Sequence, residues 1–307
     1  MTTVAWPAGL ITALVTPLRG DDIDLNVLGD LLERQIDAGV AAVLAGGGTG
    51  EFGALSVDER LVLAEAVADR LDGRLPFLVQ TGALATRDSI RLGKHAEEAG
   101  ACGLMVASPF GEPISWLERR AFYEDVHEAT SLPIMIYNTP PSGLLSLEQI
   151  QELAALPRAT AVKDSSGDVT LLGDLIAWSR TSDFAVYVGL DSLIAFAGMA
   201  GARGCLFGTG NIVPSELVRT FNLTSSQDGD GELNQTWPAL HSFLRFVETS
   251  SNYVALCKAA LQHEGLEVGD VRRPYIMPAD VERTEMVRRL DAVKQAFASA
   301  SPAQMSL

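Results

Sequence analysis

The run Ala159-Thr-Ala-Val-Lys-Asp-Ser-Ser166 begins as a short apolar segment and ends in small polar residues. An amphipathic stretch with apolar residues at helical spacing follows at residues 169–180, and a second short apolar run follows at residues 184–189. This order is typical of two parallel strands joined by a helix. This strand–helix–strand unit predicts the fold of the whole chain, because short apolar runs and amphipathic stretches alternate along the sequence on both sides of it.

Eight short apolar runs in all are expected to be strands. They lie at residues 10–16, 41–45, 76–81, 103–107, 133–138, 159–163, 184–189 and 204–208. The expected helices lie between them, at residues 25–38, 56–71, 87–99, 115–129, 146–156, 169–180 and 191–200. Ser56 and Ser146 each precede Glu or Gln by three residues, which is the capping-box spacing of a helix start. We therefore predict an α/β chain whose eight parallel strands close into a (β/α)8 TIM barrel.

A doubly wound open sheet is the competing architecture. Gly46-Gly-Gly-Thr-Gly50 does not support it, because this stretch lacks the spacing of a dinucleotide-binding fingerprint. After the eighth strand 99 residues remain (307 minus 208), with helical patterns at residues 216–221, 233–248, 252–263 and 278–297. We assign residues 1–222 to the barrel and residues 223–307 to a C-terminal helical extension packed on it.

Composition narrows the class of protein. A chain of 307 residues with 47% hydrophobic residues suits one barrel with an extension. Its 39 acidic and 23 basic residues give a net charge of −16, which argues against nucleic acid and anionic membranes as partners. No apolar run reaches the ~20 residues needed to span a bilayer, and no N-terminal signal segment is visible. With Cys102, Cys205 and Cys257 expected to be reduced thiols, we predict a cytoplasmic protein.

Lys163 is the leading catalytic candidate, because a cation is normally excluded from an apolar strand. The other three lysines (Lys94, Lys258 and Lys294) fall in segments with helical periodicity, where a solvated ammonium is expected. An apolar setting favours the neutral, nucleophilic amine, which can condense with a carbonyl carbon to form a Schiff base. The alternative is a lysine whose head reaches water or pairs with the neighbouring Asp164.

Further candidates lie where other strands end, which is where barrel enzymes carry their reactive groups. Gly47-Gly-Thr-Gly-Glu51 presents several backbone N–H groups before a helix, a turn that suits a carboxylate, although it is also compatible with a tight turn that binds nothing. Tyr137 ends the fifth strand. Near an ammonium or imine its phenol can shuttle protons with a lowered pKa, and otherwise it is a core tyrosine.

Small and polar residues end the last three strands. Ser165 follows Lys163, Gly189 and Asp191 end the seventh strand, and Thr209 ends the eighth. All four are candidates for substrate binding, and Asp191 can either cap the next helix or hold a sugar hydroxyl. No cluster of side chains has metal-ligand spacing, and the four histidines all lie in helical segments. No metal site is predicted, which disfavours a metal-dependent aldolase.

Four motifs together carry a resemblance to a known family. They are Gly47-Gly-Thr-Gly-Glu51, Tyr137-Asn138, Val162-Lys-Asp-Ser-Ser-Gly-Asp168 and Gly189-Leu-Asp191. In this order they resemble the dihydrodipicolinate synthase and N-acetylneuraminate lyase family, and the likeness runs over nearly the whole chain. The resemblance implies a (β/α)8 barrel with a helical extension and a homo-oligomer, a tetramer or dimer. It also implies a lysine imine with pyruvate or another 2-oxo acid, with no other cofactor.

Residue by residue, the resemblance implies that Lys163 forms the imine and that Tyr137 shuttles the proton. It implies that Gly48, Thr49 and Gly50 hold the substrate carboxylate. One departure touches this machinery, since the synthase and the sialic acid lyase carry a hydroxyl residue where this chain has Gly48. A relay from Tyr137 through that hydroxyl cannot operate here as it does in those enzymes.

Other departures concern the second substrate. Ser108-Pro-Phe-Gly111 stands where the synthase has paired tyrosines, and Pro140-Pro-Ser-Gly143 lacks the arginine that binds its second substrate. A role in lysine biosynthesis is therefore not expected. The stretch at residues 45–52 is similar to the 5-dehydro-4-deoxyglucarate dehydratases, but Thr139 stands where they have arginine. The stretch at residues 163–168 is more similar to the sialic acid lyase and the 2-keto-3-deoxygluconate aldolases.

The function expected from these residues is that of a lyase. Lys163 forms a Schiff base with a 2-oxo acid, and the enzyme catalyses reversible aldol cleavage and condensation with an aldehyde. One alternative keeps the imine but eliminates water from a deoxy-keto sugar acid. A second alternative is a non-catalytic sensor of 2-oxo acids. The sequence does not name the aldehyde or sugar acid, although Phe110, Trp116 and Pro141 suggest an apolar wall.

Overall fold

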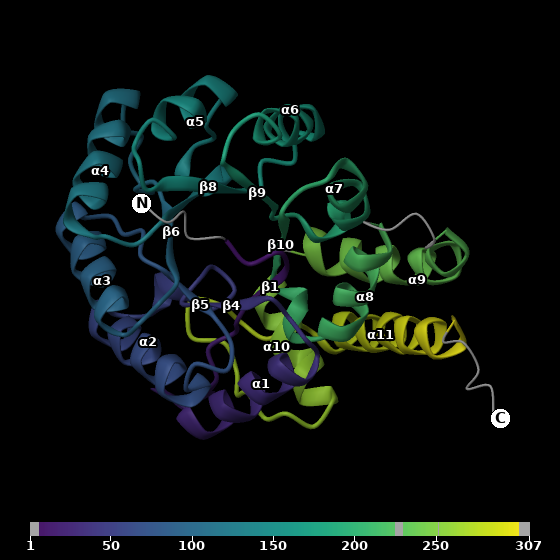
Figure 1. The fold of residues 1–307 in the computed structure, drawn as a ribbon. Coiled ribbons are helices and arrows are strands. Elements are labelled where there is room, and N and C mark those ends of the chain that lie inside the picture. The colour runs from purple at the N-terminus through teal and green to yellow at the C-terminus, as the bar shows by residue number, and fades with distance from the viewer. Residues whose placement is uncertain (1–5, 225–229, 251, 301–307) are drawn as a thin grey trace.

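The structure is a computed structural model that describes residues 6–224, 230–250 and 252–300. Eight parallel strands close into a barrel in the order β1-β10-β9-β8-β7-β6-β5-β4 (Figure 1). They are β1 (Gly9–Ala13), β4 (Ala42–Ala45), β5 (Phe77–Gln80), β6 (Gly103–Ala107), β7 (Ile134–Asn138), β8 (Ala159–Asp164), β9 (Ala185–Val188) and β10 (Gly204–Phe207). The predicted TIM barrel is confirmed, and each strand lies within three residues of its predicted limits.

Helices surround the barrel where the apolar periodicity predicts them (Figure 1). They are α1 (Leu25–Asp37), α2 (Val57–Leu71), α3 (Thr86–Glu98), α4 (Trp116–Ala129), α5 (Leu147–Leu153), α6 (Val169–Ser179), α7 (Ile194–Ala200) and α8 (Pro214–Thr224). The capping boxes predicted at Ser56 and Ser146 are present, and Ser115 forms a third at the start of α4. A short hairpin of β2 (Leu18–Arg19) and β3 (Asp22–Ile23) was not predicted, because two-residue strands carry no measurable alternation.

Short 3-10 turns follow four of the barrel strands. They are η1 (Phe52–Ala54), η2 (Pro140–Ser142), η3 (Asp191–Leu193) and η4 (Thr209–Asn211), which come after β4, β7, β9 and β10. The motifs that drew attention in the sequence therefore lie in, or directly before, the connections at the carboxyl ends of the strands. This is the end of a TIM barrel at which active sites are built.

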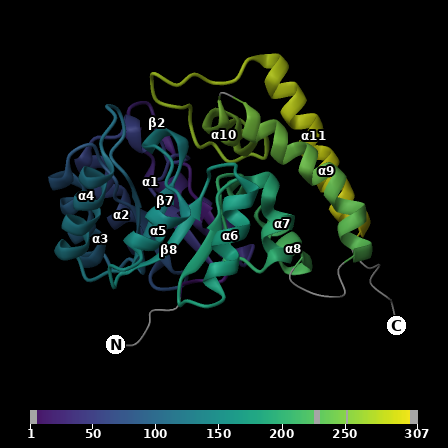
Figure 2. The same ribbon diagram turned by 90° about the horizontal axis from the view of Figure 1, so that it is seen from above.

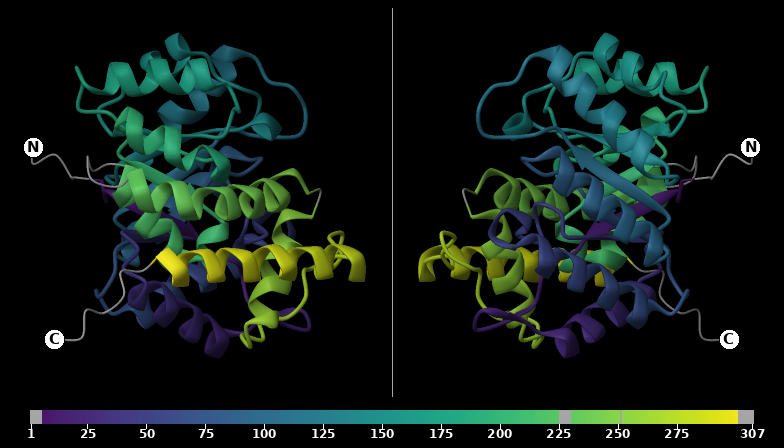
Figure 3. Two further views of the ribbon diagram at one scale, coloured as in Figure 1. Left: turned by 90° about the vertical axis from the view of Figure 1, so that its right-hand side faces the viewer. Right: turned by 90° about the vertical axis from the view of Figure 1, so that its left-hand side faces the viewer.

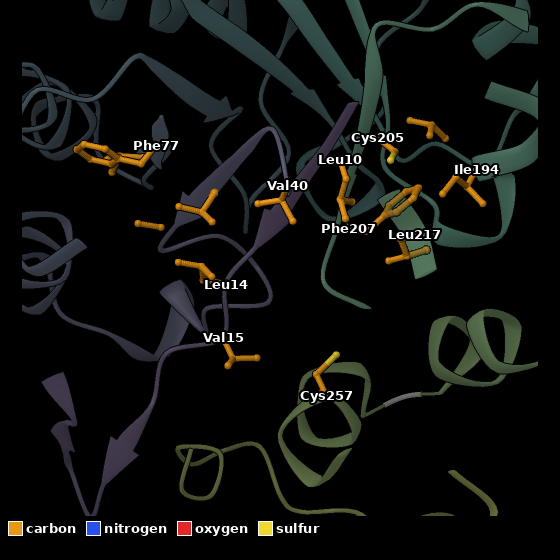
Figure 4. Packing of buried hydrophobic residues seen from close by; sticks show 14 of the residues in the cluster. Leu10, Leu14, Val15, Val40, Phe77, Ile194, Cys205, Phe207, Leu217 and Cys257 are labelled. Carbon is orange, nitrogen blue, oxygen red and sulfur yellow. The ribbon is translucent and has the colours of Figure 1, made fainter. Parts of the chain in front are cut away.

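Two apolar layers hold the barrel together. The outer layer lies between strands and helices and includes Leu10, Val40 and Phe207 (Figure 4). The inner layer fills the barrel and consists of Ile11, Ala13, Ala42, Leu44, Leu78, Met105, Met135, Ala161, Tyr187 and Leu206, with Trp6. Because side chains alternate along a strand, Lys163 continues the inward row that Ala161 begins, and Tyr137 continues the row of Met135. Both therefore stand above the apolar filling of the barrel.

The C-terminal extension consists of α9 (Asp230–Thr249), α10 (Tyr253–His263) and α11 (Asp280–Ala300). These helices gather on one side of the barrel (Figure 2), and α11 runs alongside α9 (Figure 3). Cys257 of α10 belongs to the same apolar cluster as Val15, which follows β1 (Figure 4). Helix α8 runs to Thr224, past residue 222, and the division of the chain into 1–222 and 223–307 stays a prediction.

All three cysteines are free thiols, and Cys205 and Cys257 are buried. Between Trp6 and Ala300, in the ranges that the structure describes, no helix is both long and apolar enough to cross a membrane.

Candidate functional site

Lys163 lies near the end of β8, between Tyr137 of β7 and Tyr187 of β9. Only 7% of the residue is exposed. Within the described ranges it takes part in no ion pair. Its amine is therefore enclosed by protein without being neutralised by a carboxylate, which is the setting that a Schiff-base lysine needs.

Asp164 is not the partner of this lysine. Its carboxylate accepts hydrogen bonds from Asn138 Nδ2 at 2.8 Å and from Ser166 Oγ at 2.9 Å. Asp164 follows Lys163 directly on β8, so the two side chains leave the strand on opposite faces. The sequence-based alternative of a Lys163–Asp164 pair is therefore wrong.

Tyr137 adjoins Lys163 on the neighbouring strand. The Lys163 Nζ atom lies 4.5 Å from the centroid of the Tyr137 ring. Burial acts to raise the pKa of the phenol, but the positive charge of Lys163 and the nearby hydroxyls of Thr139 and Ser165 lower it, and the pKa falls below its ordinary value. The lowered pKa predicted for Tyr137 is confirmed, and the phenol is suited to exchange a proton next to the amine.

Gly189 provides the space in which the Lys163 side chain lies. A Cβ atom at Gly189 would stand 2.8 Å from Lys163 Cε and 2.1 Å from Ser165 Oγ. Any larger residue would push the lysine stem or the serine out of place. The structure thus brings together three of the predicted site residues, Lys163, Ser165 and Gly189, and it explains why the third has no side chain.

The glycine-rich loop after β4 turns its carbonyl groups onto the protein. Gly48 O accepts from Glu51 N at 3.0 Å, and Gly50 O accepts from Thr16 Oγ1 at 2.7 Å. In the part of the chain that the structure describes, the N–H groups of Gly48, Thr49 and Gly50 donate to no protein acceptor. Three free amide donors in a row are suited to an anion. In the ring of strands β4 stands four places from β8 in either direction, so this loop faces Lys163 across the mouth of the barrel.

Asp191 lies in a buried polar cluster beside that mouth. Its Oδ1 atom accepts hydrogen bonds from the Thr209 hydroxyl, from Thr209 N at 3.3 Å and from the Tyr253 hydroxyl at 2.9 Å. Burial raises the pKa of Asp191 to about 6, although the hydroxyls of Thr209 and Tyr253 oppose the rise. Asp191 is the first residue of η3, and the N-cap of the following helix α7 is Leu193, so the capping alternative is wrong. Its contact with a sugar hydroxyl stays a prediction.

Sequence reasoning missed two functional neighbours, both from α10. Tyr253 donates a hydrogen bond to Asp191. It also lies near Thr49, since a Cβ atom added at Gly208 would be 2.6 Å from Tyr253 Cε1 and 2.6 Å from Thr49 Oγ1. Lys258 forms an ion pair with Glu51 over 2.6 Å, and neither side chain is exposed at all. The expectation that Lys258 is solvated is therefore wrong, whereas Lys94 is exposed as expected.

Lys163 is singled out because it is a cation within an apolar run. The same is true of Lys258, which stands in the apolar run Val254-Ala-Leu-Cys-Lys-Ala-Ala-Leu261. Helical periodicity masked that signal, because a cation on a helix is usually on its solvated face. No comparable signal marks Tyr253, which simply begins an apolar helix.

The loops after β4 and β6 each contribute a phenylalanine, Phe52 and Phe110, and these two side chains are in contact. Phe52 and Phe110 meet edge to face with centroids 5.4 Å apart, and the Arg60 guanidinium lies 5.3 Å from the Phe52 ring centroid. Burial lowers the pKa of Arg60 to about 10. Trp116 instead donates to Glu152 of α5 at 3.1 Å, so its indole is tied to the outer helices.

A cleft of 480 Å³ lies elsewhere, between α1 and the start of α8, and its lining includes Asp30, Glu33, Arg34, Glu216 and Lys294. None of the residues in the barrel mouth lines it, so the position of the candidate site follows from the convergence of side chains and not from this cleft. In the described residues no group of three or more His, Cys, Asp or Glu side chains is arranged to hold a metal ion.

Comparison with known proteins confirms the resemblance over nearly the whole chain. Residues 6–293 match the dihydrodipicolinate synthetase family. The 4-hydroxy-tetrahydrodipicolinate synthase of Bacillus velezensis is 32% identical over 281 residues, which cover 90% of this chain and 95% of the relative. The synthase of the same name from Sorangium cellulosum is 33% identical over 301 residues, which cover 94% of this chain and 98% of the relative.

Solved structures of the same family have the same fold as this chain. The 4-hydroxy-tetrahydrodipicolinate synthase of Methylacidiphilum fumariolicum SolV has a TM-score of 0.89 at 25% identity and covers 95% of this chain and 98% of its own. YagE, an E. coli prophage protein of the dihydrodipicolinic acid synthase family solved in complex with pyruvate, has a TM-score of 0.85 at 26% identity, with coverage of 94% and 99%. The expectation of an enzyme of the lyase class is confirmed at the level of the family. The chain belongs to the dihydrodipicolinate synthetase family.

Proposed function

We propose that the enzyme forms a Schiff base between Lys163 and the ketone carbon of pyruvate or another 2-oxo acid. The observation that carries the proposal is the buried Lys163 amine, which is in no ion pair within the described residues and lies 4.5 Å from the ring centroid of Tyr137. A neutral amine attacks the ketone and water leaves, and the protonated imine then accepts electrons when the bond between C3 and C4 breaks. The complex of the similar protein YagE with pyruvate supports this class of ligand.

The carboxylate of the 2-oxo acid binds the amides of Gly48, Thr49 and Gly50. Their free N–H groups support this role, and so does the position of the loop across the barrel mouth from Lys163. With the carboxylate of the 2-oxo acid bound to these amides, its ketone carbon is directed toward the Lys163 amine. Such orientation supplies much of the rate enhancement in reactions between two bound groups.

Tyr137 transfers the proton. In cleavage it takes the proton of the C4 hydroxyl as phenolate, and in condensation it returns that proton to the new alkoxide. The lowered pKa of Tyr137 supports this role, because it increases the phenolate population near neutral pH. Since Gly48 has no hydroxyl, the proton passes directly between Tyr137 and the substrate, without a side-chain relay through that position.

The second substrate differs from that of the named relatives. Residues 140–143 carry no arginine side chain, and the loop carbonyl Gly143 O accepts from Arg119 Nη1 at 2.9 Å. Phe52 and Phe110 add apolar surface after β4 and β6. We therefore expect an aldehyde without a carboxylate, and small apolar or aromatic aldehydes before sugar acids. We assign Ser165, Asp191 and Thr209 to the polar side of the site for this aldehyde.

A turnover assay tests the proposal. The purified enzyme is incubated with pyruvate and a panel of aldehydes, and loss of pyruvate and formation of 4-hydroxy-2-oxo acids are measured, with a Lys163→Ala variant as control. Condensation by the enzyme but not by Lys163→Ala supports an aldolase. Loss of water from a deoxy-keto sugar acid with its carbon skeleton intact would instead make the enzyme a dehydratase. Imine formation without any turnover would leave a 2-oxo acid sensor.

A further inference from the structure

Helix α10 pairs a second buried lysine with Glu51, the residue that ends the glycine-rich loop. Lys258 Nζ lies 2.6 Å from Glu51 Oε1, and both side chains are completely buried. Glu51 is the residue that follows Gly48, Thr49 and Gly50. Its backbone is left-handed, with φ 59° and ψ 32°, a conformation that residues other than glycine seldom adopt.

Both members of the pair are held from further points of the C-terminal extension. Glu51 Oε2 accepts from Arg272 N at 2.7 Å, and Lys258 Nζ donates to Asp270 O at 2.9 Å. Arg272 also donates to the carbonyl of Ala54 at 3.0 Å and pairs with Glu59. The extension thus contacts the loop and the turn after it at several points, and the Lys258 ammonium neutralises the Glu51 carboxylate.

The electrostatics of the loop give this pair a specific consequence. Three free amide donors must attract a carboxylate, yet a buried carboxylate follows them within one residue. In a poorly solvated site two like charges at short range repel strongly, and an unpaired buried carboxylate would weaken binding of any anion there. The nearest positive charge that offsets Glu51 comes from α10.

We propose that Lys258 is a positioning residue for the substrate carboxylate. It acts through Glu51, whose charge it neutralises, so that the amides of Gly48, Thr49 and Gly50 can donate hydrogen bonds to the carboxylate of the 2-oxo acid. The inference rests on the proposed function and deepens it, since it assigns to the C-terminal extension a part in binding the keto acid. An ion pair that served stability alone would leave keto acid affinity unchanged in any variant that still folds.

The test measures the pyruvate concentration that half-saturates borohydride trapping at Lys163. The full-length enzyme is compared with Lys258→Gln, which removes the charge but keeps a donor for Glu51 and Asp270. Lys294→Gln is the matched control, because Lys294 also lies in the extension and pairs with Glu216 and Glu264, away from the loop. Lys258→Gln/Glu51→Gln removes both buried charges at once.

The expected result is a half-saturating pyruvate concentration roughly ten- to a hundredfold higher in Lys258→Gln, the scale of a buried charge left without its partner. Lys294→Gln stays at the wild-type value, and the double variant returns to within about threefold of it, because the repulsion has been removed. An unchanged value in folded Lys258→Gln overturns the inference, and so does a double variant as weak as the single one.

Glu51→Gln keeps the inference testable if Lys258→Gln does not fold. It removes the repelling charge while leaving an acceptor for Arg272 and Lys258, so pyruvate should bind at least as tightly as in the wild type. Weaker binding by about tenfold or more in this variant contradicts the inference. The two proposals fail separately. If the wild type traps no pyruvate, the proposed function fails, whereas equal half-saturation in all trapping variants removes only the role of Lys258.

Discussion

Tyr137 and Lys163 are paired across strands β7 and β8, with the lysine Nζ 4.5 Å from the centroid of the tyrosine ring. Burial acts to raise the pKa of the phenol, but the positive charge of Lys163 and the hydroxyls of Thr139 and Ser165 together outweigh burial and lower this pKa. The cation therefore favours the phenolate form of Tyr137, and the positively charged protonated imine that forms on the same nitrogen should favour it in the same way. Catalysis by the proposed route depends on this pair.

Replacing Tyr137 by phenylalanine separates proton transfer from imine formation. The Tyr137→Phe enzyme should lose roughly a hundred- to ten-thousandfold in kcat, the usual contribution of a positioned acid or base. It should still form the pyruvate imine, since Lys163 and the loop amides are untouched. Steady-state kinetics and borohydride trapping measure the two steps, and a kcat within about tenfold of the wild type would argue against Tyr137 as the proton carrier.

Gly189→Ala tests the space around the lysine. The new Cβ would lie 2.8 Å from Lys163 Cε and 2.1 Å from Ser165 Oγ, so the lysine stem must move. Trapping of pyruvate should slow by about tenfold or more, as expected for a reacting group displaced by about an ångström. Gly173→Ala on α6 is the control, because nothing lies within 4 Å of its added Cβ. That control should trap pyruvate normally and gain about 0.5–1 kcal/mol in unfolding free energy.

Asp191 should make stability depend on pH. Its pKa is raised by burial from 3.8 to about 6 in the folded protein, so between these values the folded state binds more protons than the unfolded state. The contribution of Asp191 to stability therefore falls as pH rises through this window, and its full cost is present above it. The difference between 3.8 and about 6 corresponds to at most about 3 kcal/mol.

Asp191→Asn removes this titration while keeping an oxygen for Thr209 and Tyr253. Relative to the wild type, the variant should be more stable at about pH 7.5 than at about pH 4, as denaturant unfolding at the two pH values can measure. A stability difference between variant and wild type that does not change with pH would show that Asp191 keeps an ordinary pKa in the folded state.

Tyr253→Phe tests the contact between the extension and the barrel mouth. The variant loses the hydrogen bond to Asp191 at 2.9 Å and the one accepted from Thr209 N at 3.0 Å. Its unfolding free energy should drop by roughly 1–3 kcal/mol, because a buried carboxylate loses a donor. Tyr275→Phe, at an exposed position, should change it by less than about 0.5 kcal/mol. Equal effects of the two substitutions would mean that the Tyr253 hydroxyl contributes nothing.

The barrel could be read from the sequence because its signals are local. Each barrel strand is a short apolar run and each helix between the strands has apolar residues at helical spacing, and Lys163 is conspicuous because it interrupts one of the runs. The contact between Asp191 and Tyr253 joins residues 62 positions apart, and the Lys258–Glu51 pair joins a helix of the extension to a loop of the barrel. No local pattern encodes such contacts, because they depend on how the extension docks.

Mass spectrometry after borohydride reduction with pyruvate tests the central claim most directly. A reduced imine adds about 72 Da, since the keto acid joins with loss of water and gain of two hydrogens. We expect this addition on the peptide that contains Lys163 and no modification in Lys163→Ala, whereas Lys258, Lys94 and Lys294 stay unmodified. Failure of the wild-type enzyme to gain this mass at saturating pyruvate, or its appearance on another lysine, would contradict the Schiff-base mechanism at Lys163.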